Sequence, residues 1–158
     1  MLYDLLKMCV SVFFNVLNKL MGGKLPPFGT ASVIVEKDGH YLAVELPRGR
    51  TVFPGGFMTW QEQPSQAAER EGREETGLQL RALDLIGVYA NASKHMTQMS
   101  NIGFVYSAEV IGGKMRKTLE GRPRWLDEGE LRRRMDTGNL RVLDDYLRKQ
   151  DRQPASSS

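Results

Sequence analysis

Cysteine is almost absent: Cys9 is the single cysteine among 158 residues. One thiol cannot form an intramolecular disulfide, so small secreted proteins held by disulfides are excluded, as are zinc sites built from several cysteines. We therefore expect a cytoplasmic protein. Neither the 16 Gly nor the 7 Pro suggest a disordered or collagen-like chain, and 41% of the residues are apolar. A chain of this length and composition is expected to form one domain with a substantial core.

The chain also has little excess of one sign of charge, because its net charge is only +3. This excess is too small to indicate nucleic-acid binding, although it can help to attract a small polyanion. Most of the basic excess lies in the last third of the chain, where the run Arg132-Arg133-Arg134 has acidic residues on either side of it. A solvated helix face with internal ion pairs is the first interpretation of this region, and an anion-binding role is the alternative.

The sequence has no uninterrupted apolar run long enough to cross a membrane. Residues 1–21 are mostly apolar, but they have no basic start and no small-residue cleavage site, so a signal peptide is not expected. Six polar side chains interrupt the segment and would share an arc of about 120° on a helix. They are Asp4, Lys7, Ser11, Asn15, Asn18 and Lys19. The pattern predicts an amphipathic helix that ends at Gly22 and Gly23.

The wide apolar face of this helix requires a partner. We expect the helix to pack against its own domain or, across a homodimer interface, against the same helix of a second subunit. Peripheral contact with a membrane is the alternative, although the polar face carries little charge for anionic lipid. The expected organisation is therefore an N-terminal amphipathic helix over residues 1–23, a domain over 28–150 and a flexible tail over 151–158.

Strand and helix patterns alternate along the main domain. Alternating runs at 31–36 and 40–46 flank an Asp-Gly pair, which predicts a β-hairpin. A short strand at 51–53 and a turn at 54–56 precede a helix over 64–76, with Pro64 at its start and Gly77 as its stop. Strands follow at 78–89, 101–110 and 115–118, then helices at 126–135 and 140–149. This order predicts a mixed α+β fold.

The residues that could take part in catalysis or metal binding are concentrated between Gly56 and Leu78. Glu71, Glu74 and Glu75 are spaced i, i+3 and i+4, so they project from one helix face and repel one another. A solvated acidic face balanced by arginines would explain the three carboxylates alone. The preceding Gly55-Gly56 allows a backbone carbonyl to approach a metal closely, and no His or Cys accompanies the carboxylates. The pattern therefore also suits a hard cation such as Mg²⁺.

This segment resembles the Nudix box, G-x5-E-x7-R-E-U-x-E-E-x-G-U, in which U is aliphatic. The residues that match in order and spacing are Gly56, Glu62, Arg70, Glu71, Glu74, Glu75, Gly77 and Leu78. Gly72 departs from the pattern, because it stands where the family has an aliphatic residue that packs the helix on the sheet. Gly72 predicts a softer helix or the close approach of a neighbouring element.

The resemblance implies a Nudix fold, with a mixed β-sheet sandwiched between helices and the N-terminal helix as an addition. It also implies a hydrolase that cleaves the diphosphate linkage of a nucleoside diphosphate derivative with Mg²⁺ or Mn²⁺. The Gly55 carbonyl, Glu71, Glu74 and Glu75 would then form the metal site, and Arg70 and Glu62 a supporting ion pair. Glu74 or Glu71 would act as the general base. A Nudix-fold module that binds a nucleotide without turnover is the alternative.

Further residues are candidates around this box. Glu120 lies in a polar loop and is a better candidate for an additional metal ligand than Glu109, which lies inside a predicted strand. Arg48 and Arg50 could bind phosphate oxygens. Lys94 and His95 belong to a loop expected to line the mouth of the site. The expected substrate is a nucleoside triphosphate, a nucleotide sugar or a compound of the ADP-ribose type. The first two are preferred, because residues 91–95 lack the Pro that often follows the box in the ADP-ribose subfamily and the Tyr found there in the dinucleoside polyphosphate subfamily.

Overall fold

The structure is a computed structural model that describes residues 2–47, 49–93 and 95–152. Arg48, Lys94 and most of the predicted tail therefore lie outside the described residues. The elements follow in the order α1 (Leu2–Leu20), β1 (Phe28–Lys37), β2 (His40–Glu45), β3 (Thr51–Val52), β4 (Gly55–Phe57), α2 (Pro64–Thr76), β5 (Leu78–Asn91), β6 (Asn101–Gly113), β7 (Arg122–Asp127), α3 (Glu128–Arg134) and α4 (Thr137–Arg152).

The strands form one mixed sheet in the order β3-β2-β1-β6-β5, with β4 paired to β1 and β7 paired to β2. The β1 and β6 strands are parallel, and the other pairs are antiparallel. The predicted hairpin between β1 and β2 is confirmed. Its turn places Asp38 and Gly39 at φ 52° and 72°, the left-handed region that an Asp-Gly pair tolerates.

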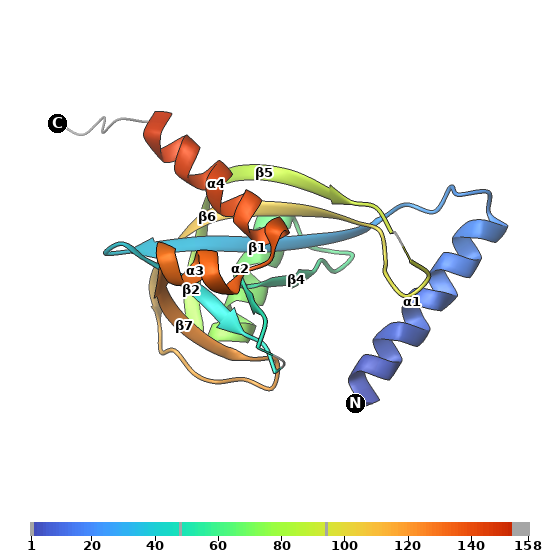
Figure 1. The fold of residues 1–158 in the computed structure, drawn as a ribbon, viewed down its shortest axis with the longest axis horizontal. Coiled ribbons are helices and arrows are strands. Elements are labelled where there is room, and N and C mark those ends of the chain that lie inside the picture. Colours follow the sequence, from blue (N-terminus) through green and yellow to red (C-terminus); the bar gives the residue numbers. More distant parts are fainter. Residues whose placement is uncertain (1, 48, 94, 153–158) are drawn as a thin grey trace.

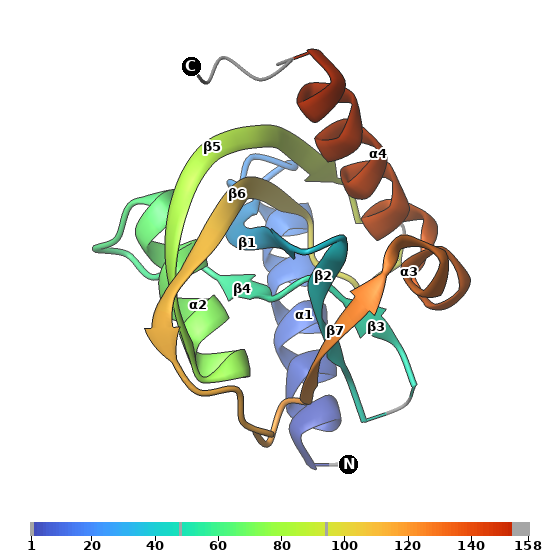
Figure 2. The same ribbon diagram turned by 90° about the vertical axis from the view of Figure 1, so that its left-hand side faces the viewer.

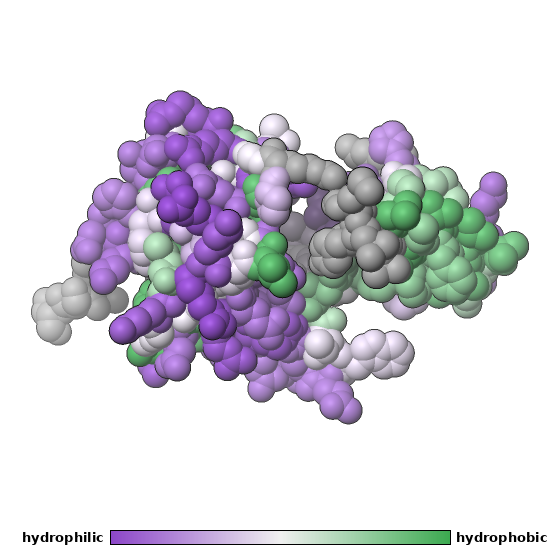
Figure 3. All heavy atoms as spheres, turned by 90° about the horizontal axis from the view of Figure 1, so that it is seen from below, coloured by the Kyte–Doolittle hydropathy of each residue, from purple (hydrophilic) through white to green (hydrophobic). Residues whose placement is uncertain are grey.

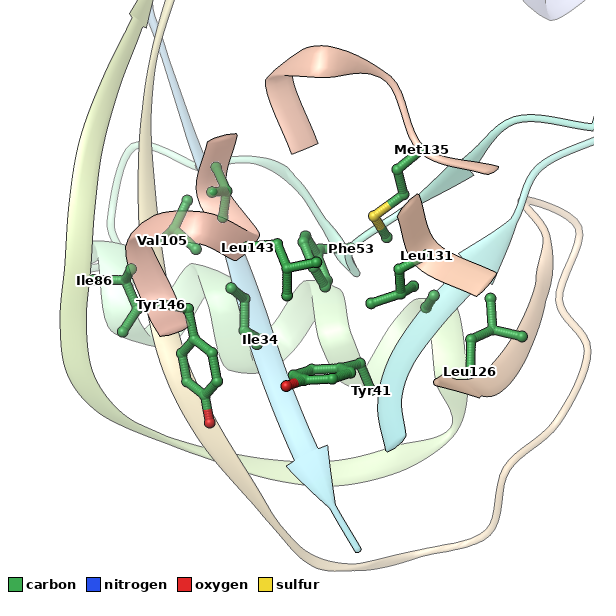
Figure 4. Close-up of a cluster of buried hydrophobic side chains, with 12 residues drawn as sticks. Ile34, Tyr41, Phe53, Ile86, Val105, Leu126, Leu131, Met135, Leu143 and Tyr146 are labelled. Carbon is green, nitrogen blue, oxygen red and sulfur yellow. The ribbon is translucent and has the colours of Figure 1, made fainter. Parts of the chain in front are cut away.

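Helices cover both faces of this sheet (Figures 1 and 2). On one face, α3 and α4 pack over Ile34, Phe53 and Val105, with Leu131 and Leu143 contributed by the helices (Figure 4). On the other face, α2 packs Ala67 and Ala68 against Val33 and Val35 of β1. Successive residues of β1 thus point to opposite faces, as the period of a strand requires. The expected α+β sandwich is confirmed.

Three local expectations were wrong. Residues 54–56 were expected to form only a turn, but Gly55 and Gly56 belong to β4 and pair with Ser32 and Ala31. Residues 115–118 form no strand. The last strand, β7, lies at Arg122–Asp127 instead, and the helix expected from residue 126 begins at Glu128. Tertiary pairing with β1 and β2 explains both strands, because each segment has only one residue that favours strands, Phe57 in β4 and Trp125 in β7.

The N-terminal helix forms as predicted and lies at one end of the molecule, away from α3 and α4 (Figure 1). Gly22 and Gly23, which follow it, have positive φ angles of 66° and 78°. No helix in the part of the chain that the structure describes is long and apolar enough to cross a membrane.

Candidate active site

Helix α2 supplies most of the residues of the site, and its bounds are those that the sequence predicts. Pro64 occupies the first turn, and the backbone N–H of Gln63 donates to Gln66 Oε1 at 2.9 Å. Gly77 ends the helix at φ 80°, where its N–H donates to the Arg73 carbonyl. Because the helix is fixed at both ends, Glu71, Glu74 and Glu75 are presented on neighbouring turns.

Two glycines allow β4 to approach its neighbours more closely than any other residue could. A Cβ on Gly55 would lie 2.4 Å from Ser32 Cβ of β1, and a Cβ on Gly56 would lie 2.4 Å from Glu71 Oε2. The Glu71 carboxylate therefore occupies the space that a side chain at position 56 would fill. In addition, the Gly55 N–H donates to Glu75 Oε2 at 2.9 Å. The Gly-Gly pair thus binds β4 to the acidic face of α2.

Arg70 is the central cation of the site. Its Nε and Nη2 donate to the two carboxylate oxygens of Glu62 at 2.9 and 2.7 Å, which is a bidentate pair. Its Nη1 donates to Glu71 at 2.7 Å and to Glu74 at 3.3 Å, and its Nη2 also donates to the Phe57 carbonyl. The predicted Arg70–Glu62 ion pair is therefore present. It joins the loop after β4 to α2.

Burial and neighbouring carboxylates raise the pKa of two other carboxyl groups of the site, those of Glu71 and Glu75. Glu75 is only 6% exposed, and this burial is the main reason that its pKa rises to about 7, against the hydrogen bond from Gly55. The neighbouring Glu120 and Glu71 carboxylates raise the pKa of Glu75 further. Burial likewise raises the pKa of Glu71 despite Arg70, with added contributions from Glu74 and Glu120. The site therefore concentrates more negative charge than Arg70 neutralises.

Glu120 reaches these carboxylates from a turn between β6 and β7. The Thr118 hydroxyl accepts hydrogen bonds from the N–H groups of Glu120 and Gly121, and the Thr118 N–H donates to the Gly121 carbonyl at 3.0 Å. The same connection is tied to the end of α2, where the Arg116 N–H donates to the Thr76 carbonyl. These bonds bring a carboxylate distant in sequence to the face of α2.

The other late candidate, Glu109, lies elsewhere. Its carboxylate accepts a hydrogen bond from Arg81 at 3.3 Å on the exposed surface of β5 and β6. The preference for Glu120 over Glu109 therefore agrees with the geometry. The sequence signal that separated them was the position of Glu120 next to Gly121 in a polar loop.

The candidate substrate-binding residues are dispersed. Arg50 donates to Asp136 at 3.2 Å, so its guanidinium is engaged at the beginning of α4. His95 is exposed in a loop that contacts α1, since Asn15 Nδ2 donates to the Met96 carbonyl in the same loop. Neither residue is joined to the α2 carboxylates by a hydrogen bond among the described residues. Trp60, in the loop between β4 and α2, is fully exposed.

Gly72 marks the place where a neighbouring element does approach closely. It is buried in the middle of α2, and a Cβ there would lie 2.5 Å from Leu80 Cδ1 of β5. Leu80, itself buried, fills the space that an aliphatic residue at position 72 would need. The departure from the box therefore changes the packing of α2 but removes none of the carboxylates.

The family was identified by comparing the chain with known proteins. The family model described as "NUDIX domain" matches residues 26–146. The chain belongs to the Nudix family. It is 32% identical over 117 residues to a "MutT-like protein" of Streptomyces ambofaciens, covering 72% of this chain and 73% of that protein. It is also 32% identical over 96 residues to an "ADP-ribose pyrophosphatase" of Methanocaldococcus jannaschii, covering 58% of this chain and 56% of that protein.

A solved structure supports the same fold. A Nudix hydrolase from Nitrosomonas europaea superimposes with a TM-score of 0.71 at 24% identity, covering 82% of this chain and 97% of that one. The Nudix box identified in the sequence thus lies on a Nudix fold. The match to the family model, together with the curated relatives, makes the chain a Nudix hydrolase. The helix α1 lies outside the residues that the family model matches.

Nudix hydrolases generally use a divalent metal, and the carboxylates fit one in their chemistry. Among the described residues no three His, Cys, Asp or Glu side chains form a ready metal cage. Mg²⁺ rarely needs such a cage, because it binds through one or two carboxylates together with water and substrate phosphates. The oxygen-only ligands suit a hard cation, and such a cation would offset both the burial and the repulsion between carboxylates that raise the pKa of Glu71 and Glu75.

Proposed function

We propose that this Nudix hydrolase is a Mg²⁺-dependent pyrophosphohydrolase that cleaves the diphosphate linkage of a nucleoside diphosphate derivative. The observation that carries the proposal is the convergence of Glu120 with Glu71 and Glu75 beside Gly55 and Gly56. Four oxygen ligands are offered: Glu71, Glu74, Glu75 and Glu120. The Gly55 carbonyl is a fifth. Mn²⁺ is the expected substitute for Mg²⁺.

In this reaction the oxygen of a water molecule bonds to one phosphorus, the bridging P–O bond breaks, and the water gives up a proton. A divalent metal supplies charge neutralisation at the phosphate oxygens and lowers the pKa of the attacking water. The chain itself must accept the proton. Of the two candidates, Glu71 is hydrogen-bonded to Arg70 at 2.7 Å, whereas the Glu74 side chain is 56% exposed and holds Arg70 only at 3.3 Å. This freedom favours Glu74 as the general base.

Arg70 and Glu62 act as positioning residues in this proposal. The bidentate pair fixes the loop after β4, and the remaining Arg70 donor holds Glu71 and Glu74 in place. Without this cation, the acidic face of α2 would carry unbalanced repulsion whenever no metal is bound.

A cavity lined by the neighbours of Glu120 in the chain, but not by Glu120 itself, is the candidate site for the remainder of the substrate. It has a volume of about 730 Å³ and lies between the β2–β3 connection and the turn that carries Glu120. Its lining includes Lys117, Arg122 and Arg134, of which Arg134 is engaged with Glu45. Basic side chains in the lining suit a ligand with several phosphates. We propose that phosphate oxygens bind there.

The substrate is tested with a panel of nucleotides: ATP, dGTP, ADP-ribose, a nucleotide sugar and a dinucleoside tetraphosphate. ADP-ribose belongs on the panel because of the name of the archaeal relative, although the chain lacks the Pro typical of that subfamily. We expect hydrolysis of at least one compound with Mg²⁺, its loss with EDTA and its recovery on adding Mg²⁺. Tight binding of a nucleotide without turnover at any metal concentration would instead indicate a binding module.

A further inference from the structure

Helix α1 is attached to the rest of the protein by its polar side. Asn15 Nδ2 donates to the carbonyls of Met96 and Gln98, both at 2.9 Å, and the Asn18 carboxamide oxygen accepts from the Leu25 N–H at 3.0 Å. Ser11 is 5% exposed on the same side. These positions share an arc of about 60° on the helix. The polar stripe of α1 is therefore used within the molecule.

One aromatic contact completes this attachment. Phe14, which borders the polar stripe, packs edge-on against Phe28 of β1 with ring centroids 4.8 Å apart, and Phe28 contacts Phe57 in turn. The orientation of α1 is thus fixed by hydrogen bonds and by a ring contact together. It is opposite to the expectation that the apolar face would pack against the domain.

The apolar side of α1 faces outward. The exposed side chains on this side are Leu5, Met8, Cys9, Val10, Val12, Phe13, Val16 and Leu20. Phe13 is 62% exposed and Leu20 is 80% exposed. Figure 3 shows an apolar surface over α1, while the face of the main domain seen in this view is largely hydrophilic. A continuous exposed apolar patch of this kind indicates an interaction surface.

We infer that this face of α1 binds the surface of a lipid bilayer, with the helix lying in the interface. The exposed apolar positions span about 200° of the helix circumference. A single partner helix covers a stripe of only about 100°, so a second copy of α1 would leave about half of this face in water. A lipid surface covers the whole half-cylinder at once, which is how interfacial helices bury their apolar side.

The charges near this face suit an anionic lipid. Lys19 is the only charged side chain among the described side chains of α1, residues 5 and 8–20, and it lies close to one edge of the exposed apolar arc. Lys24 follows the helix and is also exposed. Lysines at the border of an apolar face can extend their ammonium groups to the headgroups while their stems stay in the apolar layer. Because no described helix is able to span a bilayer, the binding is peripheral.

Flotation of the full-length protein with lipid vesicles tests this inference. The vesicles are either phosphatidylcholine alone or an equimolar mixture of phosphatidylcholine and phosphatidylglycerol. We expect the wild type to float with both and more strongly with the mixture. The double variant Phe13→Gln with Leu20→Gln should bind at least about tenfold more weakly, because it replaces two of the most exposed apolar side chains of α1 by a polar residue with good helix propensity.

A matched control changes two apolar side chains that are also exposed, although less so than Phe13 and Leu20, and that lie on the sheet. Leu83→Gln with Ile111→Gln alters residues of β5 and β6 that are 52% and 50% exposed, and this variant should float like the wild type. Replacing Lys19 and Lys24 by Gln should weaken binding to the mixed vesicles severalfold and leave binding to phosphatidylcholine unchanged.

Two outcomes would overturn the inference. One is a wild type that floats with neither kind of vesicle. The other is a dimer, measured by light scattering, that the Phe13→Gln/Leu20→Gln variant converts to a monomer while neither protein binds vesicles. In that case the occupant of the apolar face is a second copy of the chain.

Discussion

At the scale of single residues, Arg70 connects more of the site than any other described side chain. Its pair with Glu62 is partly buried and hydrogen-bonded through Nε and Nη2, and it lowers the pKa of Glu62 to about 2. Removing one partner leaves a charge without its counterion in a site already rich in carboxylates. Arg70→Ala should therefore lower both the stability of the fold and the rate of hydrolysis.

A double-mutant cycle measures this pair. We expect Arg70→Ala and Glu62→Ala to be coupled by about 0.5 to 3 kcal/mol in the free energy of unfolding. Arg81→Ala with Glu109→Ala is the matched control, because that ion pair is exposed and should couple by less than about 1 kcal/mol. Strict additivity of the Arg70 and Glu62 changes would mean that the two side chains do not interact in solution.

Glu75 predicts an unusual pH dependence for the metal-free protein. Its pKa is about 7 in the folded chain and 4.5 as an ordinary carboxyl group, so the folded state binds the proton more tightly. The free energy of unfolding should therefore fall as the pH rises from about 4.5 to about 7, by up to about 3 kcal/mol. Glu62, with its lowered pKa, acts in the opposite direction but only below pH 4.5.

Urea unfolding in EDTA across this pH range measures the effect. Glu75→Gln is neutral at every pH and should abolish most of the decline, which would make the variant more stable than the wild type at pH 8. An equal decline in the variant would show that another group is responsible. Such a gain in stability from removing a carboxylate is typical of residues kept for function.

At the scale of secondary structure, the contact between α2 and β5 depends on Gly72. Ala is a better helix former than Gly by about 1 kcal/mol, so propensity alone predicts that Gly72→Ala stabilises the protein. The structure predicts the reverse, because the new methyl would lie 2.5 Å from the buried Leu80 side chain. We expect Gly72→Ala to destabilise the fold by about 1 to 3 kcal/mol.

Shortening the Leu80 side chain tests whether the close contact between positions 72 and 80 causes this loss of stability. In a Leu80→Ala background, which makes room, Gly72→Ala should cost nothing or increase stability, as measured by thermal or urea unfolding. Gly138→Ala is the control, since the nearest atom to its Cβ is at an ordinary 3.4 Å and it lies in the first turn of α4. Equal costs in both backgrounds would contradict the close contact.

The elements also differ in how well the sequence predicted them. Helix α2 was predicted to the residue because Pro64 and Gly77 mark its ends and its carboxylate spacing is that of a helix. Strands β4 and β7 were missed because Gly55-Gly56 and the charged segment from Arg122 to Asp127 have low strand propensity, and their pairing depends on distant residues of β1 and β2. The outward side of α1 could not be predicted either. A helical pattern shows which face is apolar but not which face the domain binds.

At the scale of the whole molecule, the candidate active site and the outward face of α1 depend on different elements. The carboxylates are held by α2, β4 and the turn before β7, whereas α1 is attached through the loop near Met96 and through Phe28. Figure 1 shows α1 at one end of the domain. Attachment to a bilayer through α1 would therefore leave the fold of the hydrolase domain unchanged. It would place hydrolysis next to a membrane.

The central claim is that the carboxylates on α2 perform metal-dependent hydrolysis, and turnover of Glu75→Gln at saturating Mg²⁺ tests it most directly. The change removes one charge and almost no volume, and the substrate is the best compound of the nucleotide panel. We predict that kcat falls on the order of 10² or more while the fold is retained, and that Glu109→Gln keeps the wild-type rate. Wild-type turnover by Glu75→Gln and by Glu74→Gln under the same conditions would contradict the account.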